Sequence, residues 1–142
     1  MIYILVTINT LIFLFLSGLH VYWAFGGRWA FEGVFPSKAD NTPLGKQPSK
    51  LATLVVAAGL GAFAFITLGA THIFDSWISS RLFNIGLWTI SVIFLLRTIG
   101  EFKYVGLTKT VKGTLFARRD QQIYTPLTFG ITLISALILW LG

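Results

Sequence analysis

Ionisable side chains that could hold a ligand or a proton stand at the ends of strongly apolar stretches. An imidazole belongs to the run His20-Val21-Tyr22-Trp23, and Arg97 and Glu101 stand four residues apart at the end of another apolar stretch. On a helix this spacing places both charged groups on one face, where they can form an ion pair. Asp120 and Tyr124 repeat the same spacing farther along the chain.

We expect a small polar pocket where these groups meet, bounded by His20, Arg97, Glu101 and Tyr124. The candidate ligand-binding residues are His20, Trp23, Arg97, Glu101, Tyr104, Arg118, Asp120 and Tyr124. They include no nucleophile with a base and an orienting group, so we predict no catalytic residue and expect a binding protein rather than an enzyme. In the simpler alternative, Arg97 pairs with Glu101 or with a lipid phosphate and only fixes the depth of its helix.

Four long apolar segments must position these groups. They span about residues 2–23, 51–70, 82–100 and 124–141. Each is close to the roughly 20 residues that a helix needs to cross a bilayer. A membrane span must satisfy its own backbone hydrogen bonds, so these segments are predicted to be helices. The sequence therefore predicts an all-α, polytopic membrane four-helix bundle that forms one transmembrane domain over residues 1–142.

The basic residues predict how the bundle is oriented. Nine of them lie in the first and third connections and one in the second: Arg28, Lys38, Lys46 and Lys50; Lys103, Lys109, Lys112, Arg118 and Arg119; and Arg81. Connections one and three lie on the same side of the membrane when the number of helices is even. Cytoplasmic loops are enriched in Lys and Arg, so we expect both termini to lie outside the cytoplasm.

Composition narrows the partners and cofactors. The net charge of +6 is carried by residues that flank apolar segments, which favours membrane lipids over nucleic acid as the partner. The chain has no cysteine, and His72 with Asp75 makes too few ligands for a metal site, so we expect no metal and no cofactor. Small residues in the second segment, including Ala57 and Gly61, indicate close helix packing, within this bundle or across a dimer.

Three motifs resemble a known family. They are His20-Val21-Tyr22-Trp23-Ala24-Phe25-Gly26-Gly27, then Arg97-Thr98-Ile99-Gly100-Glu101-Phe102-Lys103-Tyr104-Val105-Gly106, and Phe116-Ala117-Arg118-Arg119-Asp120 followed by Tyr124-Thr125-Pro126-Leu127. In order and spacing they are similar to DUF3995, a family of small bacterial membrane proteins, and the resemblance covers essentially the whole chain. It implies a four-helix protein of the bacterial inner membrane with no established activity. Glu101 stands where the family pattern leads us to expect Asp.

Three functions remain open at this point. The first is the binding of a lipid or another amphipathic molecule at the cytoplasmic-leaflet end of the bundle, with Arg97 and Arg118 holding an anionic headgroup. The second is an accessory or regulatory subunit of a larger membrane complex. The third is an enzyme acting on a lipid headgroup, with His20 or Glu101 as base and Arg97 stabilising charge.

Overall fold

The computed structural model describes residues 1–142 and is built from helices. They are α1 (Ile2–Ala24), α2 (Lys50–Gly69), α3 (Ser80–Ile99), α4 (Leu115–Arg119), the π-helical turn η1 (Asp120–Tyr124) and α5 (Thr125–Leu141). The last three follow one another directly and form one helical stretch of 27 residues, Leu115–Leu141, which we call the fourth helix. The prediction of an all-α fold with four spans is confirmed. The fourth span, however, begins about nine residues earlier than predicted.

The surface of the helices identifies a multi-pass membrane protein. All four are long and apolar enough to cross a bilayer. Large apolar side chains point outward along them, including Leu11, Phe15, Val55, Ile85 and Leu96. In water such a surface would be costly, whereas hydrocarbon accepts it.

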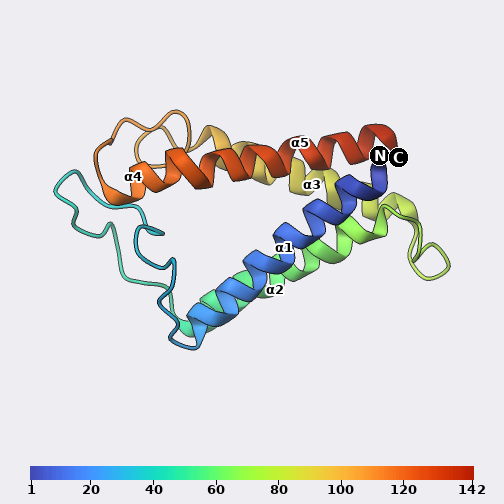
Figure 1. The fold of residues 1–142 in the computed structure, drawn as a ribbon, viewed down its shortest axis with the longest axis horizontal. Coiled ribbons are helices and arrows are strands. Elements are labelled where there is room, and N and C mark those ends of the chain that lie inside the picture. Colours follow the sequence, from blue (N-terminus) through green and yellow to red (C-terminus); the bar gives the residue numbers. More distant parts are fainter.

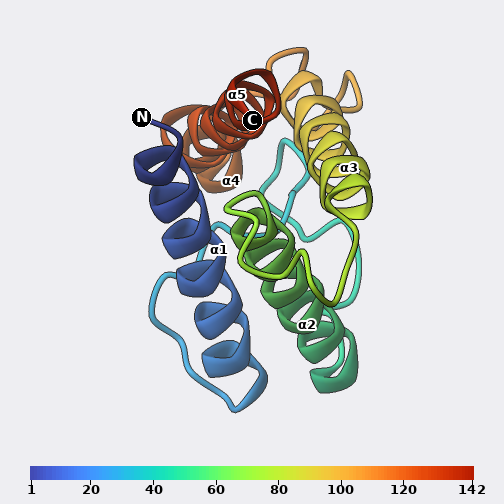
Figure 2. The same cartoon turned by 90° about the vertical axis from the view of Figure 1, so that its right-hand side faces the viewer.

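The helices form two pairs that are joined at one end of the molecule. Helix α1 packs along α2, and α3 packs along α5. The two pairs meet at the end that carries both termini and diverge toward the end that carries residues 25–49 and 100–114 (Figure 1). We call these the terminal end and the connection end. Viewed along the bundle, α1 and α3 lie diagonally across it (Figure 2).

Two apolar clusters and a polar contact join the pairs. Near the middle, the ring centroid of Phe13 lies 5.6 Å from those of both Phe63 and Phe94, so α1, α2 and α3 meet there. A second cluster toward the terminal end contains Val6, Ala70, Leu87 and Ile138. Between them along α1 and α5, Asn9 Nδ2 donates to Ser135 Oγ at 3.1 Å, and both residues are fully buried. Such buried polar contacts between membrane helices fix their register.

The small residues of α2 serve packing within this bundle. Ser17 Oγ on α1 donates to the carbonyl oxygen of Ala57 at 2.7 Å, and the same hydroxyl lies against Gly61. The close approach of the two backbones needs small side chains at both α2 positions. The neighbouring pair Ala58 and Ala62 faces the outside of the bundle.

The first connection, residues 25–49, is ordered by local contacts rather than by a helix. An isolated bridge pairs Ser37 with Pro43. Between them, Asp40 Oδ1 accepts hydrogen bonds from Thr42 Oγ1 at 2.7 Å and from its backbone N–H at 3.0 Å. These bonds favour the charged carboxylate, and the hydroxyl of Thr42 is the main cause that lowers the pKa of Asp40.

Candidate functional site

The chain turns sharply where α3 ends, and this turn determines the structure of the connection end. The helix stops at Gly100, which adopts a φ of +88°. This left-handed backbone is unfavourable for residues with a Cβ, and a Cβ at this position would also overlap the backbone of Val105. Gly106 has a φ of +80°, and a Cβ there would lie 2.6 Å from the Gly100 Cα. The two glycines therefore let the chain fold back against the end of α3.

The π-helical turn then carries Asp120 into the protein. Thr114 caps the start of the fourth helix, since its hydroxyl accepts the backbone N–H of Ala117 at 3.0 Å. Six residues after Asp120 stands Pro126, which lacks the N–H that an α-helix would use. The turn before it is wider than an α-helix, with the Thr125 N–H donating to the Asp120 carbonyl, and it adapts the helix to the missing donor.

Asp120 binds three donors that come from two other parts of the chain. Its Oδ1 accepts Arg97 Nη2 at 2.7 Å, and its Oδ2 accepts the Gly106 N–H at 2.9 Å and Lys109 Nζ at 3.2 Å. The Asp120 side chain is fully buried, and that of Lys109 is 5% exposed. We call Arg97, Gly106, Lys109 and Asp120 the Asp120 centre. It fastens the third connection, residues 100–114, to α3 and to the fourth helix.

The predicted pairing of Arg97 with Glu101 is wrong. The spacing argument assumed that the helix continues through Glu101, but α3 ends at Ile99. Glu101 lies beyond the turn at Gly100 and accepts the backbone N–H of Tyr104 instead. Arg97 consequently takes its partner from the fourth helix. Tyr104 likewise does not continue the face of α3.

The other predicted site residues form no hydrogen bond or ion pair with this centre. The His20 ring packs on Trp23 at a centroid distance of 5.0 Å, and its Nδ1 bonds to the Leu16 carbonyl at 2.7 Å. The Tyr124 ring faces Phe116 at 6.1 Å, and Arg118 is exposed. No hydrogen bond or ion pair joins His20, Glu101 or Tyr124 to Arg97. The single pocket expected for these four residues stays a prediction.

A groove of about 430 Å³ opens beside the Asp120 centre. Its polar side chains are Lys109, Lys112, Gln121 and two threonines, and its apolar side chains come from the third connection and from α5. The complete lining is Thr98, Leu107, Lys109, Lys112, Gln121, Thr125, Pro126 and Phe129. We call this cavity the basic groove.

The basic groove contains donors without partners inside the protein. Lys112 is exposed and forms no ion pair. The hydroxyl of Thr125 is buried and makes no hydrogen bond with another protein group. The adjoining Asp120 centre holds two cations against one carboxylate, a surplus of one positive charge. The arrangement is suited to holding an anion beside an apolar surface.

Sequence reasoning missed most of the groove. From the sequence, Lys109 and Lys112 predicted only the orientation, and Thr125 stood out only as part of a family motif. Their shared position depends on the irregular path of residues 100–114, which has no period to read. One signal was available, since apolar residues such as Leu107 alternate with lysines in this segment.

Comparison with known proteins agrees with the resemblance of the motifs. A family model described as "Protein of unknown function (DUF3995)" matches residues 13–135, which include all of α2 and α3 and parts of α1 and α5. Neither the curated proteins nor the solved structures contain a match. The matched stretch covers most of the chain, from the middle of α1 to the buried Ser135 of α5. The chain therefore belongs to the DUF3995 family, a family of unknown function.

Proposed function

We propose that this protein binds the headgroup of an anionic phospholipid in the basic groove, at the cytoplasmic leaflet of a bacterial inner membrane. One observation carries the proposal. Two lysines and Gln121 line the same cavity as the apolar side chains of Leu107 and Phe129. A lipid has this combination of an anionic group and an apolar body, whereas a soluble anion would gain nothing from the apolar wall.

Charge explains why the ligand should be anionic. Lys109 and Arg97 share the single carboxylate of Asp120, which leaves one positive charge uncompensated. Lys112 forms no ion pair with a carboxylate. A phosphate diester supplies one negative charge and oxygen acceptors for the ammonium group of Lys112.

The membrane position is consistent with such a ligand. Leu107 is 71% exposed and Phe129 is 47% exposed, and α5 continues from Phe129 as an apolar span. A headgroup in the groove would leave its acyl chains along the lipid-facing side of α3 and α5. The basic asymmetry of the connections favours the cytoplasmic leaflet, where anionic lipids attract Lys and Arg.

A lipid titration tests the proposal. The detergent-purified protein is titrated with phosphatidylglycerol and with phosphatidylcholine, and bound lipid is counted by native mass spectrometry. We expect phosphatidylglycerol to bind more tightly, and Lys112→Gln to weaken it by about tenfold, the loss of one charge-assisted contact. Lys103→Gln is the matched control because Lys103 lies in the same connection but stacks on Tyr104 outside the groove. Equal weakening by both variants, or equal binding of both lipids, would refute the proposal.

A further inference from the structure

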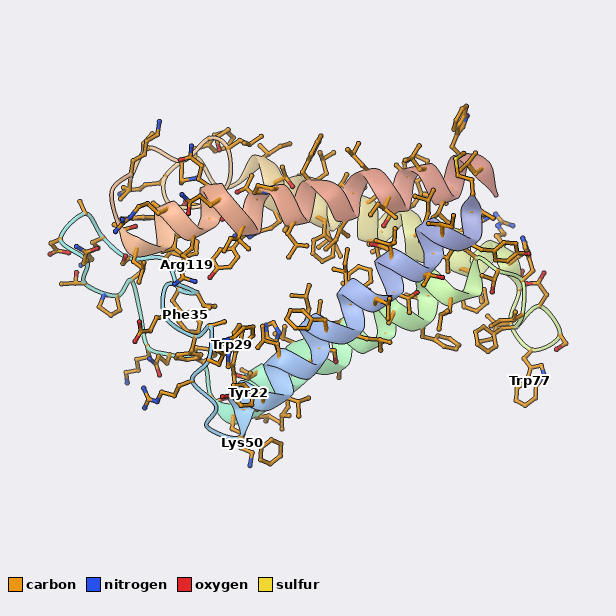
Figure 3. The ribbon with its side chains drawn as sticks, in the orientation of Figure 1. Tyr22, Trp29, Phe35, Lys50, Trp77 and Arg119 are labelled. Carbon is orange, nitrogen blue, oxygen red and sulfur yellow. The ribbon has the colours of Figure 1, made fainter.

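A second charged pocket lies between the first connection and the fourth helix. Its volume is about 270 Å³, and it is lined by Arg28, Trp29, Ala30, Glu32 and Arg119. Figure 3 shows Arg119 on the α4 side facing the first connection, with Trp29 beyond Phe35 and close to Tyr22 at the end of α1. None of these residues lines the basic groove. We call this cavity the arginine pocket.

Close packing positions Arg119 in this pocket. Gly33 adopts a φ of +74°, and a Cβ on it would lie 3.1 Å from the Cγ of Arg119 and 3.0 Å from the Cγ of Leu115. The aliphatic part of the arginine thus lies directly on the glycine backbone. A residue with a Cβ would push these two side chains away and would also be strained in the left-handed conformation.

Contacts with α1 hold the other side of the pocket. Trp23 Nε1 donates to the Trp29 carbonyl at 2.8 Å. The ring of Phe31 packs edge-on against Trp23 at 5.7 Å and against Phe35 at 5.3 Å. The turn that carries Arg28 and Glu32 is therefore anchored to α1 while it also contacts α4, and the pocket lies between this turn and Arg119.

The charged groups of the pocket have no partners among themselves or elsewhere. Neither Arg28 nor Arg119 forms an ion pair, and Glu32 forms none either. Two guanidinium groups bind the oxygens of a phosphate in fork-like geometry. A carboxylate in the same pocket repels a purely anionic ligand but accepts hydrogen bonds from an ammonium group, and the exposed face of Trp29 also attracts a cation. The pocket thus matches a ligand that carries a phosphate and an amine together.

An apolar groove adjoins this pocket along the outer face of α1. It is open, has a volume of about 510 Å³, and is lined by Leu14, Phe15, Gly18, Leu19, Tyr22 and Trp29. Trp29 lines both cavities. Gly18 provides space in the groove, because a Cβ there would meet no atom within 4 Å. A polar pocket joined to an apolar groove in this way is shaped for a headgroup with an acyl chain rather than for a free headgroup.

We propose that the arginine pocket and the α1 groove bind a zwitterionic phospholipid whose phosphate is linked to a primary ammonium. The phosphate lies between Arg28 and Arg119, the ammonium bonds to Glu32, and one acyl chain follows the groove past Gly18. This site is separate from the basic groove and selects a different headgroup. Its lipid would tie the first connection to the fourth helix.

Native mass spectrometry with defined lipids tests the site. The detergent-purified chain is titrated with phosphatidylethanolamine, phosphatidylcholine and phosphatidylglycerol, and with soluble phosphoethanolamine. We expect phosphatidylethanolamine to bind tighter than phosphatidylcholine, whose quaternary ammonium cannot donate a hydrogen bond, and Glu32→Gln to remove this preference. Arg119→Gln should weaken phosphatidylethanolamine by about tenfold. Lys112→Gln should leave it unchanged, so that failure here and failure at the basic groove are distinguishable.

A matched pair of glycine variants tests the acyl-chain groove. Gly18→Leu fills the groove, whereas Gly130→Leu on α5 places the same side chain at a position that is equally open. We expect only Gly18→Leu to weaken phosphatidylethanolamine, with both variants keeping the thermal unfolding midpoint of the parent. The proposal is overturned if Arg119→Gln binds the lipid as the parent does, if the two leucine variants bind alike, or if soluble phosphoethanolamine binds as tightly as the lipid.

Discussion

At the scale of single residues, Asp120 organises the connection end. The sequence identified Arg97 and Asp120 as candidates because charges are rare in these segments, yet it paired Arg97 with Glu101. That error has a definite origin, since a helical spacing rule was applied across Gly100, where the helix has ended. Lys109 was not foreseen as a partner because its distance from Asp120 depends on a loop conformation. Residue type indicated which groups matter, and only the folded loop shows how they pair.

Replacing Asp120 should destabilise the protein strongly. Asp120→Asn leaves the buried Lys109 and the half-buried Arg97 without a countercharge. Breaking buried ion pairs in this way costs about 3–5 kcal/mol. Unfolding by sodium dodecyl sulfate, followed by circular dichroism, measures the free energy. Glu101→Gln is the control, since this exposed carboxylate has no cationic partner and its loss should cost about 0.5 kcal/mol or less. Similar losses in both variants would contradict the role of Asp120.

At the scale of elements, hydropathy located the four spans, and local backbone chemistry determined their ends. The fourth span was predicted to begin at about residue 124, next to Thr125 and Pro126, a pair that is typical of a helix start. The structure instead uses Thr114 as the cap, and a π-helical turn comes just before the proline, which lies in the first turn of α5. The basic and polar residues between them concealed this extension, since a hydropathy criterion for spans excludes residues such as Arg118, Arg119 and Asp120.

Two of the three glycines of the third connection, Gly106 and Gly113, should differ in their tolerance of a side chain. Gly106 and Gly113 both adopt positive φ, but a Cβ at Gly106 would collide with the backbone of Gly100, whereas one at Gly113 would meet nothing. Gly113→Ala should therefore cost only the strain of a left-handed alanine, about 1 kcal/mol. Gly106→Ala should cost more and also displace the N–H that Asp120 accepts. The same unfolding measurement compares them, and an equal cost would mean that the Gly100–Gly106 contact is unimportant.

At the scale of the whole molecule, the bundle consists of two helix pairs that diverge toward its charged end. The sequence predicted four helices and the gathering of polar groups near their ends. The divergence of the pairs could not be foreseen, because it follows from contacts such as Phe13 with Phe94 and Asn9 with Ser135 that join segments far apart in the chain. Both proposed lipid sites depend on this arrangement, since each lies where a connection folds against a helix at the connection end.

Labelling of single cysteine variants tests the orientation of the bundle. The excess of basic residues in the first and third connections predicts that both lie in the cytoplasm. The chain has no cysteine, so single variants can be labelled selectively. In intact cells an impermeant maleimide should label Gly142→Cys, and it should reach the exposed Ala39→Cys only after permeabilisation. The reverse pattern would place the basic groove in the other leaflet.

The most direct test of lipid binding in the basic groove is to identify what the protein retains from its own membrane. The parent, Lys112→Gln and Lys103→Gln are purified in mild detergent, and bound lipids and proteins are quantified by mass spectrometry. We predict that the parent and Lys103→Gln retain an acidic phospholipid in stoichiometric amount and that Lys112→Gln loses most of it. Equal acidic lipid in all three proteins, or a stoichiometric partner protein without acidic lipid, would contradict the account and favour an accessory subunit instead.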